Sequence, residues 1–299
     1  MLRLAHWVSV LVTIFTSASC RRLIVHTNDV DQGLNGSLCE RACDALVSGH
    51  INASIPTGSS SLSSGIFFHE GFVMKTISNK HENIWNHECH VGMRVNQFSS
   101  RFDDDNKTFS HVTAQEGIGF QNSDAAQKHA KLIKTHCCRQ CQNSQLILVL
   151  DFARGVPLES FVSPAGLQVN ITQHEDAIFR RVTDTLKAAW DEERFAHNDV
   201  HPGNVVVDLD SGGLRSVTLI DYGVSGFDLP ETRANPNLCV VHLSHDDDIA
   251  DVEGDLPCEH SPETSHKRDL IMLGFRYKML KEQRRLHKRN MMNSDTHNQ

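Results

Sequence analysis

The sequence predicts an α+β fold of two lobes, a mostly β small lobe followed by a shortened, α-helical large lobe. Short apolar runs bounded by turn residues, at 66–75 and 145–150, predict strands in the first half of the chain. Apolar residues spaced three or four positions apart, at 178–190 and 268–280, predict helices in the second half. Between these helices, residues 204–220 contain two apolar runs around a Gly-Gly turn, which predicts a β-hairpin.

The composition is that of a globular protein. The chain has 299 residues, of which 39% are hydrophobic and 22% are charged, so it can bury a sizeable core in one two-lobed domain or two small ones. Its net charge of −8 argues against a general nucleic-acid-binding protein, although basic residues cluster near the C-terminus. We therefore expect no nucleic-acid partner.

Residues 1–20 have the pattern of a signal peptide. Arg3 and His6 precede an apolar core, 7–15, that is too short to span a bilayer, and small residues at 17–19 offer a cleavage site before or at Cys20. The alternatives are a short buried helix or a membrane anchor. We expect a secreted or secretory-pathway luminal protein with no stable membrane span after the signal is cleaved.

Sequons and cysteines both favour secretion. Four N-x-[ST] sequons are free of proline, at Asn35, Asn52, Asn106 and Asn170. Cleavage after Cys20 leaves eight of the nine cysteines, an even number that suits disulfides, whose pairing the sequence leaves open. Cys39 and Cys43 lie on a predicted helix closed by Gly49, within an N-terminal extension, 21–54, and we expect them to bond to other parts of the domain.

A cysteine cluster at His136-Cys137-Cys138 and Cys141 has two interpretations. A C-x2-C pair beside a histidine is typical of zinc sites, but a tetrahedral site needs four ligands and no second paired set occurs. In an oxidising compartment disulfides are the favoured interpretation.

The predicted small lobe, 55–150, begins with a turn of small residues from Gly58 to Gly65. Such a turn lets backbone N–H groups approach phosphate oxygens closely, although serine-rich turns are also common surface loops. A hairpin follows whose second strand ends at Lys75, and then an amphipathic helix, 81–98, that contains Glu82 and Glu88.

The predicted large lobe, 151–299, follows the apolar strand at 145–150. A turn from Asp151 to Gly155 and a short helix near 157–162 come first. Thr172 and Glu175 have the spacing of a capping box at the start of the long helix through Trp190. The chain ends in a basic helix or tail, 281–290.

The most informative stretch runs from Phe195 to Gly223. His197-Asn198-Asp199 is followed five residues after the aspartate by Asn204, and the second run of the hairpin ends on Asp221-Tyr222-Gly223. Phosphoryl transfer needs a group that orients the attacking hydroxyl and groups that hold metal ions against the phosphates. The alternative is a hairpin whose polar ends only make turn hydrogen bonds.

This stretch resembles the protein-kinase-like superfamily, with HND for the usual HRD and DYG for the usual DFG. The ending HPGN is closer to the aminoglycoside-phosphotransferase-like and atypical kinases. The resemblance implies that Asp199 orients the acceptor hydroxyl and takes its proton, and that Asn204 and Asp221 bind Mg²⁺ or Mn²⁺.

The resemblance also assigns roles in the rest of the chain. Lys75 would bind the α- and β-phosphates of ATP, positioned by Glu88, which suits the middle of its helix better than Glu82 does. The segment of Asp151 and Ala153 would be the hinge that binds adenine, and Gly58 and Gly65 would flank the phosphates. Asp269 would brace the catalytic loop, although a helix N-cap explains it almost as well.

The sequence therefore predicts a kinase-like enzyme that transfers the ATP γ-phosphoryl group to a hydroxyl of a protein, glycan or small molecule. The alternative is a secreted pseudokinase that acts as a binding or scaffold module. The chain departs from ordinary protein kinases in having no further helices after 268–280, which puts protein-substrate recognition in doubt.

Overall fold

The structure is a computed structural model that describes residues 35–49, 53–55, 63–69, 71–102, 129–139, 145–163, 171–211, 213–230, 235–241, 258–259 and 266–296. The signal segment 1–20, Gly58, Cys141 and the sequons at Asn52, Asn106 and Asn170 lie outside these residues. The chain forms two compact units. Of the described residues, unit 1 contains those of 35–89 and 134–152, and unit 2 contains those of 90–133, 153–241 and 258–296.

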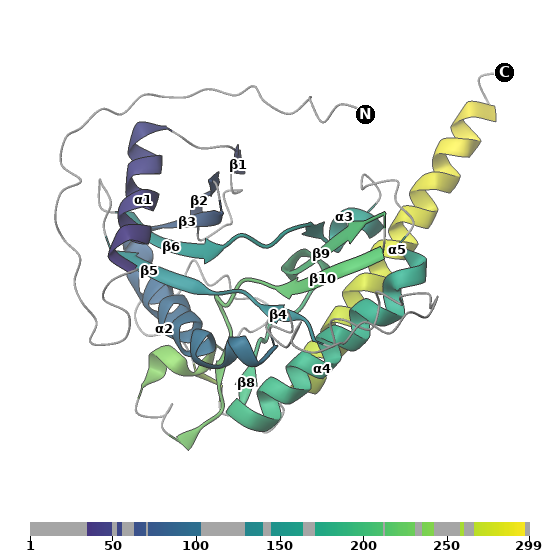
Figure 1. Cartoon of the computed structure of the whole chain (residues 1–299). Coiled ribbons are helices and arrows are strands. Elements are labelled where there is room, and N and C mark those ends of the chain that lie inside the picture. Colours follow the sequence, from purple (N-terminus) through teal and green to yellow (C-terminus); the bar gives the residue numbers. More distant parts are fainter. Residues whose placement is uncertain are drawn as a thin grey trace, which may run out of the picture. The chain divides into compact units, whose positions relative to one another are not determined.

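The sheet of unit 1 has five antiparallel strands in the order β1-β2-β3-β6-β5 (Figure 1). Their bounds are β1 Ala53–Ile55, β2 Ser63–His69, β3 Phe72–Ser78, β5 Thr135–Arg139 and β6 Gln145–Asp151. The predicted hairpin is β2 and β3, which turn at Gly71, where φ of +82° suits a residue without a Cβ. The predicted apolar strand is β6, and its four residues from Leu146 to Val149 are buried because helices pack on both faces of the sheet.

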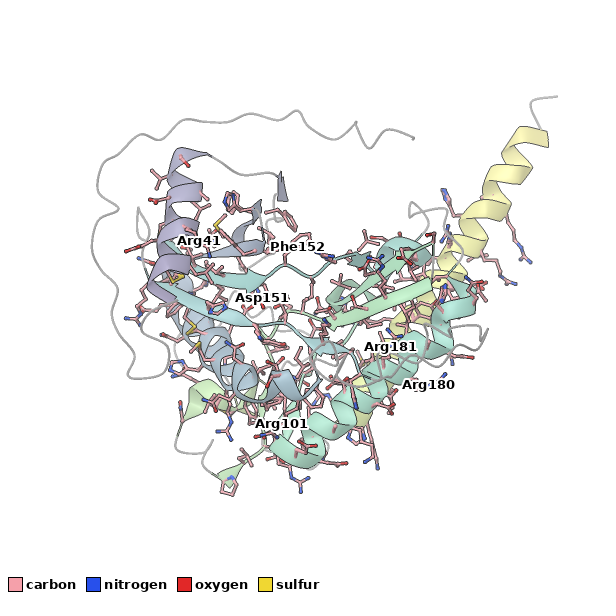
Figure 2. The ribbon with its side chains drawn as sticks, in the orientation of Figure 1. Arg41, Arg101, Asp151, Phe152, Arg180 and Arg181 are labelled. Atoms are coloured by element: carbon pink, nitrogen blue, oxygen red, sulfur yellow. A yellow bond between two sulfur atoms is a disulfide. The ribbon has the colours of Figure 1, made fainter. Side chains whose placement is uncertain are left out.

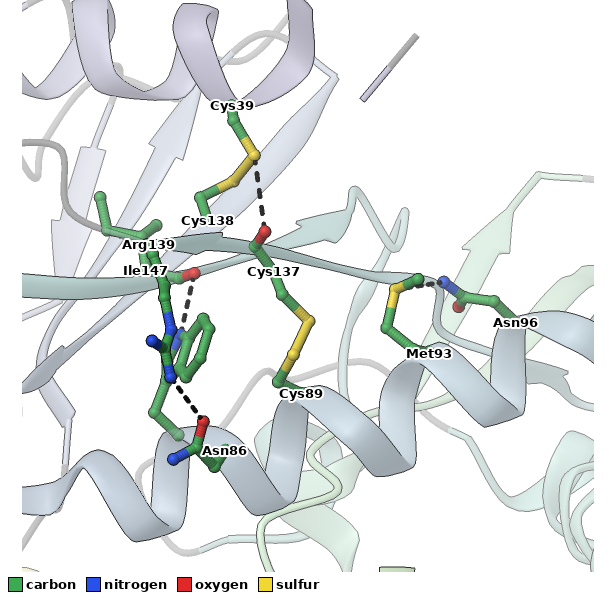
Figure 3. Close-up of a disulfide and its surroundings, with 10 residues drawn as sticks. Cys39, Asn86, Cys89, Met93, Asn96, Cys137, Cys138, Arg139 and Ile147 are labelled. Carbon is green, nitrogen blue, oxygen red and sulfur yellow. Dashed lines mark hydrogen bonds between the residues drawn. A yellow bond between two sulfur atoms is a disulfide. The ribbon is translucent and has the colours of Figure 1, made fainter. Parts of the chain in front are cut away.

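Two helices cover the two faces of this sheet, and disulfides attach them. Cys137 and Cys138 are consecutive in β5, so their side chains point to opposite faces. Cys138 is bonded to Cys39 of α1 (Asn35–Ser48), and Cys137 is bonded to Cys89 of α2 (Glu82–Ser99) (Figure 3). The disulfide interpretation is thus confirmed for Cys137 and Cys138, and Cys43 is disulfide-bonded as well.

The hydrophobic core of unit 1 follows the same division. Alternate residues of the strands face α1, and the cluster on that side contains Ala42, Ala45, Phe72, Met74, Cys138, Ile147 and Val149. The cluster on the side of α2 contains Ile77, Trp85, Cys89, Leu146 and Leu148. Each large apolar side chain buried in this way contributes about 1.5–3 kcal/mol, so packing as well as the disulfides attaches both helices.

Unit 2 is built around a second, smaller sheet in the order β4-β10-β9-β7. The bounds are β4 Lys131–Leu132, β7 Val156–Pro157, β9 Val205–Asp210 and β10 Gly213–Leu219. β9 and β10 form the hairpin predicted from the two apolar runs. Two short pairs accompany it: β8 (Phe195–Ala196) with β11 (Gly226–Phe227), and β12 (Val240–Val241) with β13 (Cys258–Glu259).

The helices of unit 2 are α3 (Glu159–Val162), α4 (Glu175–Glu193) and α5 (His266–Thr296). α4 and α5 pack side by side (Figure 1), with the rings of Phe179 and Tyr277 5.1 Å apart and Lys281 bonded to Glu175 at 2.9 Å. The second half of α2 also belongs to unit 2, where Phe98 contacts Phe195 and Phe227.

One local prediction was wrong. The capping box does not form, because a 3-10 turn, Thr172–His174, precedes α4, whose N-cap is His174 without a side-chain cap bond. For the basic segment 281–290, the helical alternative is confirmed, because α5 continues through it to Thr296. The predicted α+β class is confirmed, with a sheet-rich unit and a unit that carries the long helices. Within the described part of the chain, no helix has the length and apolar character needed to cross a membrane.

Candidate active site

Lys75 and Glu88 form an ion pair inside unit 1. Lys75 projects from the middle of β3 and Glu88 from α2, and the lysine Nζ donates to both carboxylate oxygens at 3.0 and 2.8 Å. Glu88 is 1% exposed, so its charge depends on this partner for compensation. Glu82, the other candidate, instead bonds Arg139 at the surface, at 2.9 Å. The geometry therefore assigns the lysine to Glu88.

The predicted hinge lies where the chain passes from unit 1 to unit 2, between Phe152 and Ala153. Asp151 ends β6 and is exposed, and Phe152 follows it (Figure 2). The backbone N–H groups of both residues already donate, to the carbonyl oxygens of Lys134 and Gly71. Ala153, the other residue predicted to bind adenine, is the first residue of unit 2 after this point. Gly65 lies in β2, where an added Cβ would come within 2.8 Å of the Phe67 ring.

The catalytic loop connects β8 to β9 in unit 2. Its centre is the 3-10 turn η6 (Pro202–Asn204), which begins with proline and is capped by His201, whose Nδ1 accepts from the Gly203 N–H at 3.0 Å. The Asn204 amide donates to the backbone oxygen of Asp199 at 3.0 Å and to its carboxylate at 3.3 Å. These bonds hold Asn204 and Asp199 together and leave the amide oxygen of Asn204 directed away from that carboxylate.

Asp221 follows β10 and lies next to the same loop. The Ile220 N–H donates to the Asn204 carbonyl at 3.1 Å, which brings the backbones of the two predicted metal ligands together. Asp221 has a left-handed φ of +68°, a conformation that costs free energy in a non-glycine residue and is found most often at functional sites. Tyr222 is buried and donates its hydroxyl to Ile133, so the residue after Asp221 anchors the turn.

His197 and Asp269 hold the catalytic loop through buried hydrogen bonds. The Asp269 carboxylate on α5 is buried and accepts the His197 N–H at 3.1 Å, with further backbone bonds from Asn198 and Val200. Burial raises the pKa of Asp269 to about 7, against the opposing effect of these bonds. Burial likewise lowers the pKa of His197 to about 4, so the ring is neutral and its Nε2 donates to Ile220 at 3.0 Å. Asp269 is therefore no N-cap; it braces the loop.

Asn198 connects the loop to the segment after Asp221. Its amide donates to the Val241 carbonyl at 2.8 Å, and the Val241 N–H donates to Val224 at 3.1 Å. Cys239, two residues earlier, is bonded to Cys258. Asn198, which stands where the HRD motif has arginine, thus donates directly to a backbone carbonyl of this segment. This hydrogen bond requires no charged group on the segment.

Two basic residues beside Asp199, His201 and Arg276, were not predicted from the sequence. His201 Nε2 lies 3.6 Å from one Asp199 oxygen, and Arg276 Nη1 lies 3.5 Å from the other. The pKa of His201 is lowered mainly by burial and further by Arg276. His201 was visible as a basic residue within the motif, whereas Arg276 comes 77 residues after Asp199 and no local pattern marks it.

The residues present fit a hard divalent cation. The amide oxygen of Asn204 and the carboxylate of Asp221 are oxygen donors of the kind that Mg²⁺ and Mn²⁺ prefer. Zinc has no comparable set in the described stretches, where no group of three or more His, Cys, Asp or Glu residues is placed to hold a metal ion. Asn204 and Asp221 are the residues that would bind the metal.

The loop that contains Asp199 lies in a region that is similar to a known family. The family model of the ABC1 atypical kinase-like domain matches residues 121–252, which include the whole catalytic loop and Asp221. Among solved structures, the kinase domain of Mycobacterium tuberculosis PknI, a double mutant, is similar at 16% identity and a TM-score of 0.32. That likeness covers 58% of this chain and 57% of that kinase domain. No curated protein matches the chain.

Residues 121–252 are therefore similar to the ABC1 atypical kinase-like domain, and they contain Asp199, Asn204 and Asp221, whose spacing predicts a kinase-like protein.

Proposed function

We propose that this protein is an active kinase of the secretory pathway that transfers the γ-phosphoryl group of ATP to a hydroxyl of an acceptor. The observation that carries the proposal is the fixed geometry of the catalytic loop. Asn204 bonds Asp199, Ile220 bonds Asn204, and a buried aspartate, Asp269, holds the backbone of the whole turn. Such preorganisation is what phosphoryl transfer requires from a protein.

Each residue has a chemical role in this proposal. Asp199 orients the acceptor hydroxyl and accepts its proton, for which its half-exposed carboxylate is accessible. Asn204 and Asp221 hold the metal, which supplies charge neutralisation at the phosphates when it is bound. Lys75, held by Glu88, binds the α- and β-phosphates.

Three features support the secretory location. Three disulfides join described cysteines, Cys39–Cys138, Cys89–Cys137 and Cys239–Cys258, and disulfides persist in oxidising compartments. The N-terminal twenty residues have the signal-peptide pattern, and four sequons occur in the chain.

A nucleotide-binding experiment tests the activity and separates it from the pseudokinase alternative. Without metal, the Asp221 carboxylate would face the phosphates as a like charge, so ATP should raise the melting temperature substantially only with Mg²⁺ or Mn²⁺. Asp221→Asn should remove this gain. Asp199→Ala should keep it and yet lose phosphoryl transfer by about 10²–10⁴-fold, because Asp199 contacts the acceptor and not the metal.

The possible results differ clearly. Metal-independent stabilisation by ATP that persists in Asp221→Asn would favour a pseudokinase. Absence of any ATP effect would exclude both nucleotide-binding functions. Labelled ATP offered with separate protein, glycan and small-molecule pools identifies the acceptor class.

A further inference from the structure

The solvent-facing side of α5 carries an exposed apolar stripe. Among the described residues, seven large hydrophobic side chains are exposed, and five of them lie on this one helix: Ile271, Met272, Phe275, Met279 and Leu286. Ile271 and Phe275 are the most exposed, at 71% and 60%. Such concentration on one element is unusual in a soluble surface and indicates a site of interaction.

The spacing makes these residues one continuous line. Ile271, Phe275 and Met279 are four residues apart, and Leu286 lies seven beyond Met279, so all four share a face of the helix. From Ile271 to Leu286 the line is about 22 Å long at about 1.5 Å per residue. The opposite face of α5 is occupied, since Leu273 and Tyr277 are buried and Tyr277 packs on α4. The stripe is therefore separate from the core.

The stripe also adjoins the catalytic aspartate. Arg276 lies between Met272 and Met279, one turn from each, and its Nη1 is 3.5 Å from Asp199 Oδ1. Arg276 and Asp199 are both partly exposed, so this ion pair is weak and an incoming anionic group can replace the carboxylate at little cost. A molecule bound along the stripe would thus reach the position where the acceptor hydroxyl must lie.

The charge of α5 indicates what binds there. The helix contains nine Lys and Arg residues and three Asp and Glu residues, in a chain whose net charge is −8. Lys278 and Arg289 are exposed beside the stripe, and in the described part of the chain no ion-pair partner accompanies them. An occupant with acidic groups near its apolar groups would neutralise these cations.

We propose that this face of α5 is the docking surface for the acceptor, and that the acceptor is a polypeptide segment in which acidic residues accompany apolar ones around the hydroxyl. The proposal rests on the proposed kinase function. A line of about 22 Å exceeds what a small metabolite can cover but matches a helical or extended segment. A second copy of the chain would place two basic helices in contact, and their like charges would repel.

The test uses the full secreted chain and an oriented peptide library with labelled ATP and Mn²⁺. We expect phosphorylation to favour peptides with acidic and apolar residues near the hydroxyl. Phe275→Glu/Met279→Glu and, separately, Lys278→Glu should raise KM for the best peptide roughly tenfold or more, with kcat within about twofold, because they remove binding distant from the reacting atoms. Matched controls are Met93→Glu, an exposed methionine of α2, and Arg180→Glu, an exposed arginine of α4 (Figure 2), which should change neither value.

A binding measurement separates docking from catalysis. The probe is a fluorescent peptide of leucines at helical spacing with glutamates between them, added to Asp199→Ala without nucleotide. Binding that the Phe275→Glu/Met279→Glu change abolishes, and Met93→Glu does not, supports docking even if no transfer is found. Transfer with no acidic or apolar preference, or with KM unchanged in the α5 variants, overturns the docking proposal while leaving the kinase function intact.

Other possible occupants of the stripe would be detected by different measurements, and each of these results would overturn the proposal. If another part of the chain covers the stripe, Phe275→Glu will lower the melting temperature of the free protein. If a second copy covers it, sedimentation will show a dimer that this substitution dissociates. If a membrane covers it, vesicles of phosphatidylcholine with phosphatidylserine will bind the protein in a Phe275-dependent manner and the peptide probe will not.

Discussion

Two buried titratable residues, His197 and Asp269, hold the catalytic loop, and their pKa values move in opposite directions. Burial disfavours the charged form of each, so it lowers the pKa of His197 to about 4 and raises that of Asp269 to about 7. The neutral histidine stabilises the fold above its unfolded pKa, and that contribution is lost as pH falls toward 4. The aspartate contribution is complete below its unfolded pKa and is lost as pH rises through 7. Between pH 4 and 6.5, His197 therefore makes the folded state more stable as pH rises, whereas Asp269 makes it less stable.

Asp269→Asn isolates the aspartate effect. The variant lacks the cost of ionising a buried carboxylate, so its stability relative to wild type should improve as pH rises from 4 to 8. The improvement should reach up to about 4 kcal/mol, at about 1.4 kcal/mol for each unit of pKa shift. Urea unfolding of both proteins across this pH range measures it. Parallel pH profiles would show that Asp269 ionises normally in the folded protein.

The Lys75–Glu88 pair gives a second prediction for single residues, with an internal control. Glu88→Gln removes the partner of a largely buried lysine, so we expect a loss of about 3 kcal/mol in stability and a roughly 10²-fold fall in transfer, since Lys75 is no longer positioned. Glu82→Gln, on the same helix, loses only its exposed pair with Arg139 and should cost under about 1 kcal/mol. Equal behaviour of the two variants in unfolding and kinetics would reject the assigned role of Glu88.

The segment after Asp221 contains three short strands, β11, β12 and β13, that are held by contacts with one another and with the catalytic loop. β12 and β13 pair and are joined by Cys239–Cys258, while Asn198 bonds Val241. An added Cβ at Gly226 of β11 would come within 2.2 Å of the Cys239 backbone, so β11 packs directly on this segment. The described part of the segment is therefore held by a disulfide and by backbone contacts.

Replacing both cysteines tests this structural role. Cys239→Ser/Cys258→Ser opens a link across 19 residues and should cost about 3 kcal/mol of stability. Phosphoryl transfer should fall as well, because Asn198 loses a fixed partner. The matched control, Cys39→Ser/Cys138→Ser, removes a disulfide of unit 1 and should lower stability while sparing kcat of the folded protein. If both pairs lower kcat alike, the segment around Val241 has no special role.

Sequence patterns predicted elements well where the signal is local. The hairpins at Gly71 and after Asn204, the strand β6 and the helix containing Glu88 follow from apolar periodicity and turn residues. The capping box failed because Thr172 begins a 3-10 turn and Glu175 bonds Lys281, a partner 106 positions away. For the basic segment 281–290 the sequence left a helix and a tail as alternatives, because the segment has no apolar period of its own, and the structure shows the helix.

Across the whole molecule, contacts between residues that are far apart in the sequence could not be predicted from it. Eight cysteines allow many connectivities, and only the fold shows that adjacent Cys137 and Cys138 attach helices on opposite faces of one sheet. Arg276 reaches Asp199 because Asp269, seven residues earlier on the same helix, bonds α5 to the catalytic loop. The motif residues were predictable because their spacing is itself the signal.

Entry into the secretory pathway is the prediction that concerns the whole chain. Disulfides form and persist only where the compartment is oxidising, and Cys39–Cys138, Cys89–Cys137 and Cys239–Cys258 fix both units. Expressed in eukaryotic cells, the protein should therefore migrate faster after glycosidase treatment and change mobility on reduction. A variant with asparagine replaced by glutamine at the four sequons should lose the first shift and keep the second, because glycan attachment and disulfide formation are independent. A chain lacking residues 2–20 should remain in the cytosol, reduced and poorly folded, because it lacks the signal that delivers it to the oxidising lumen. Recovery of the full-length chain from the cytosol, unglycosylated and fully reduced yet active, would contradict both the location and the structural importance of the disulfides.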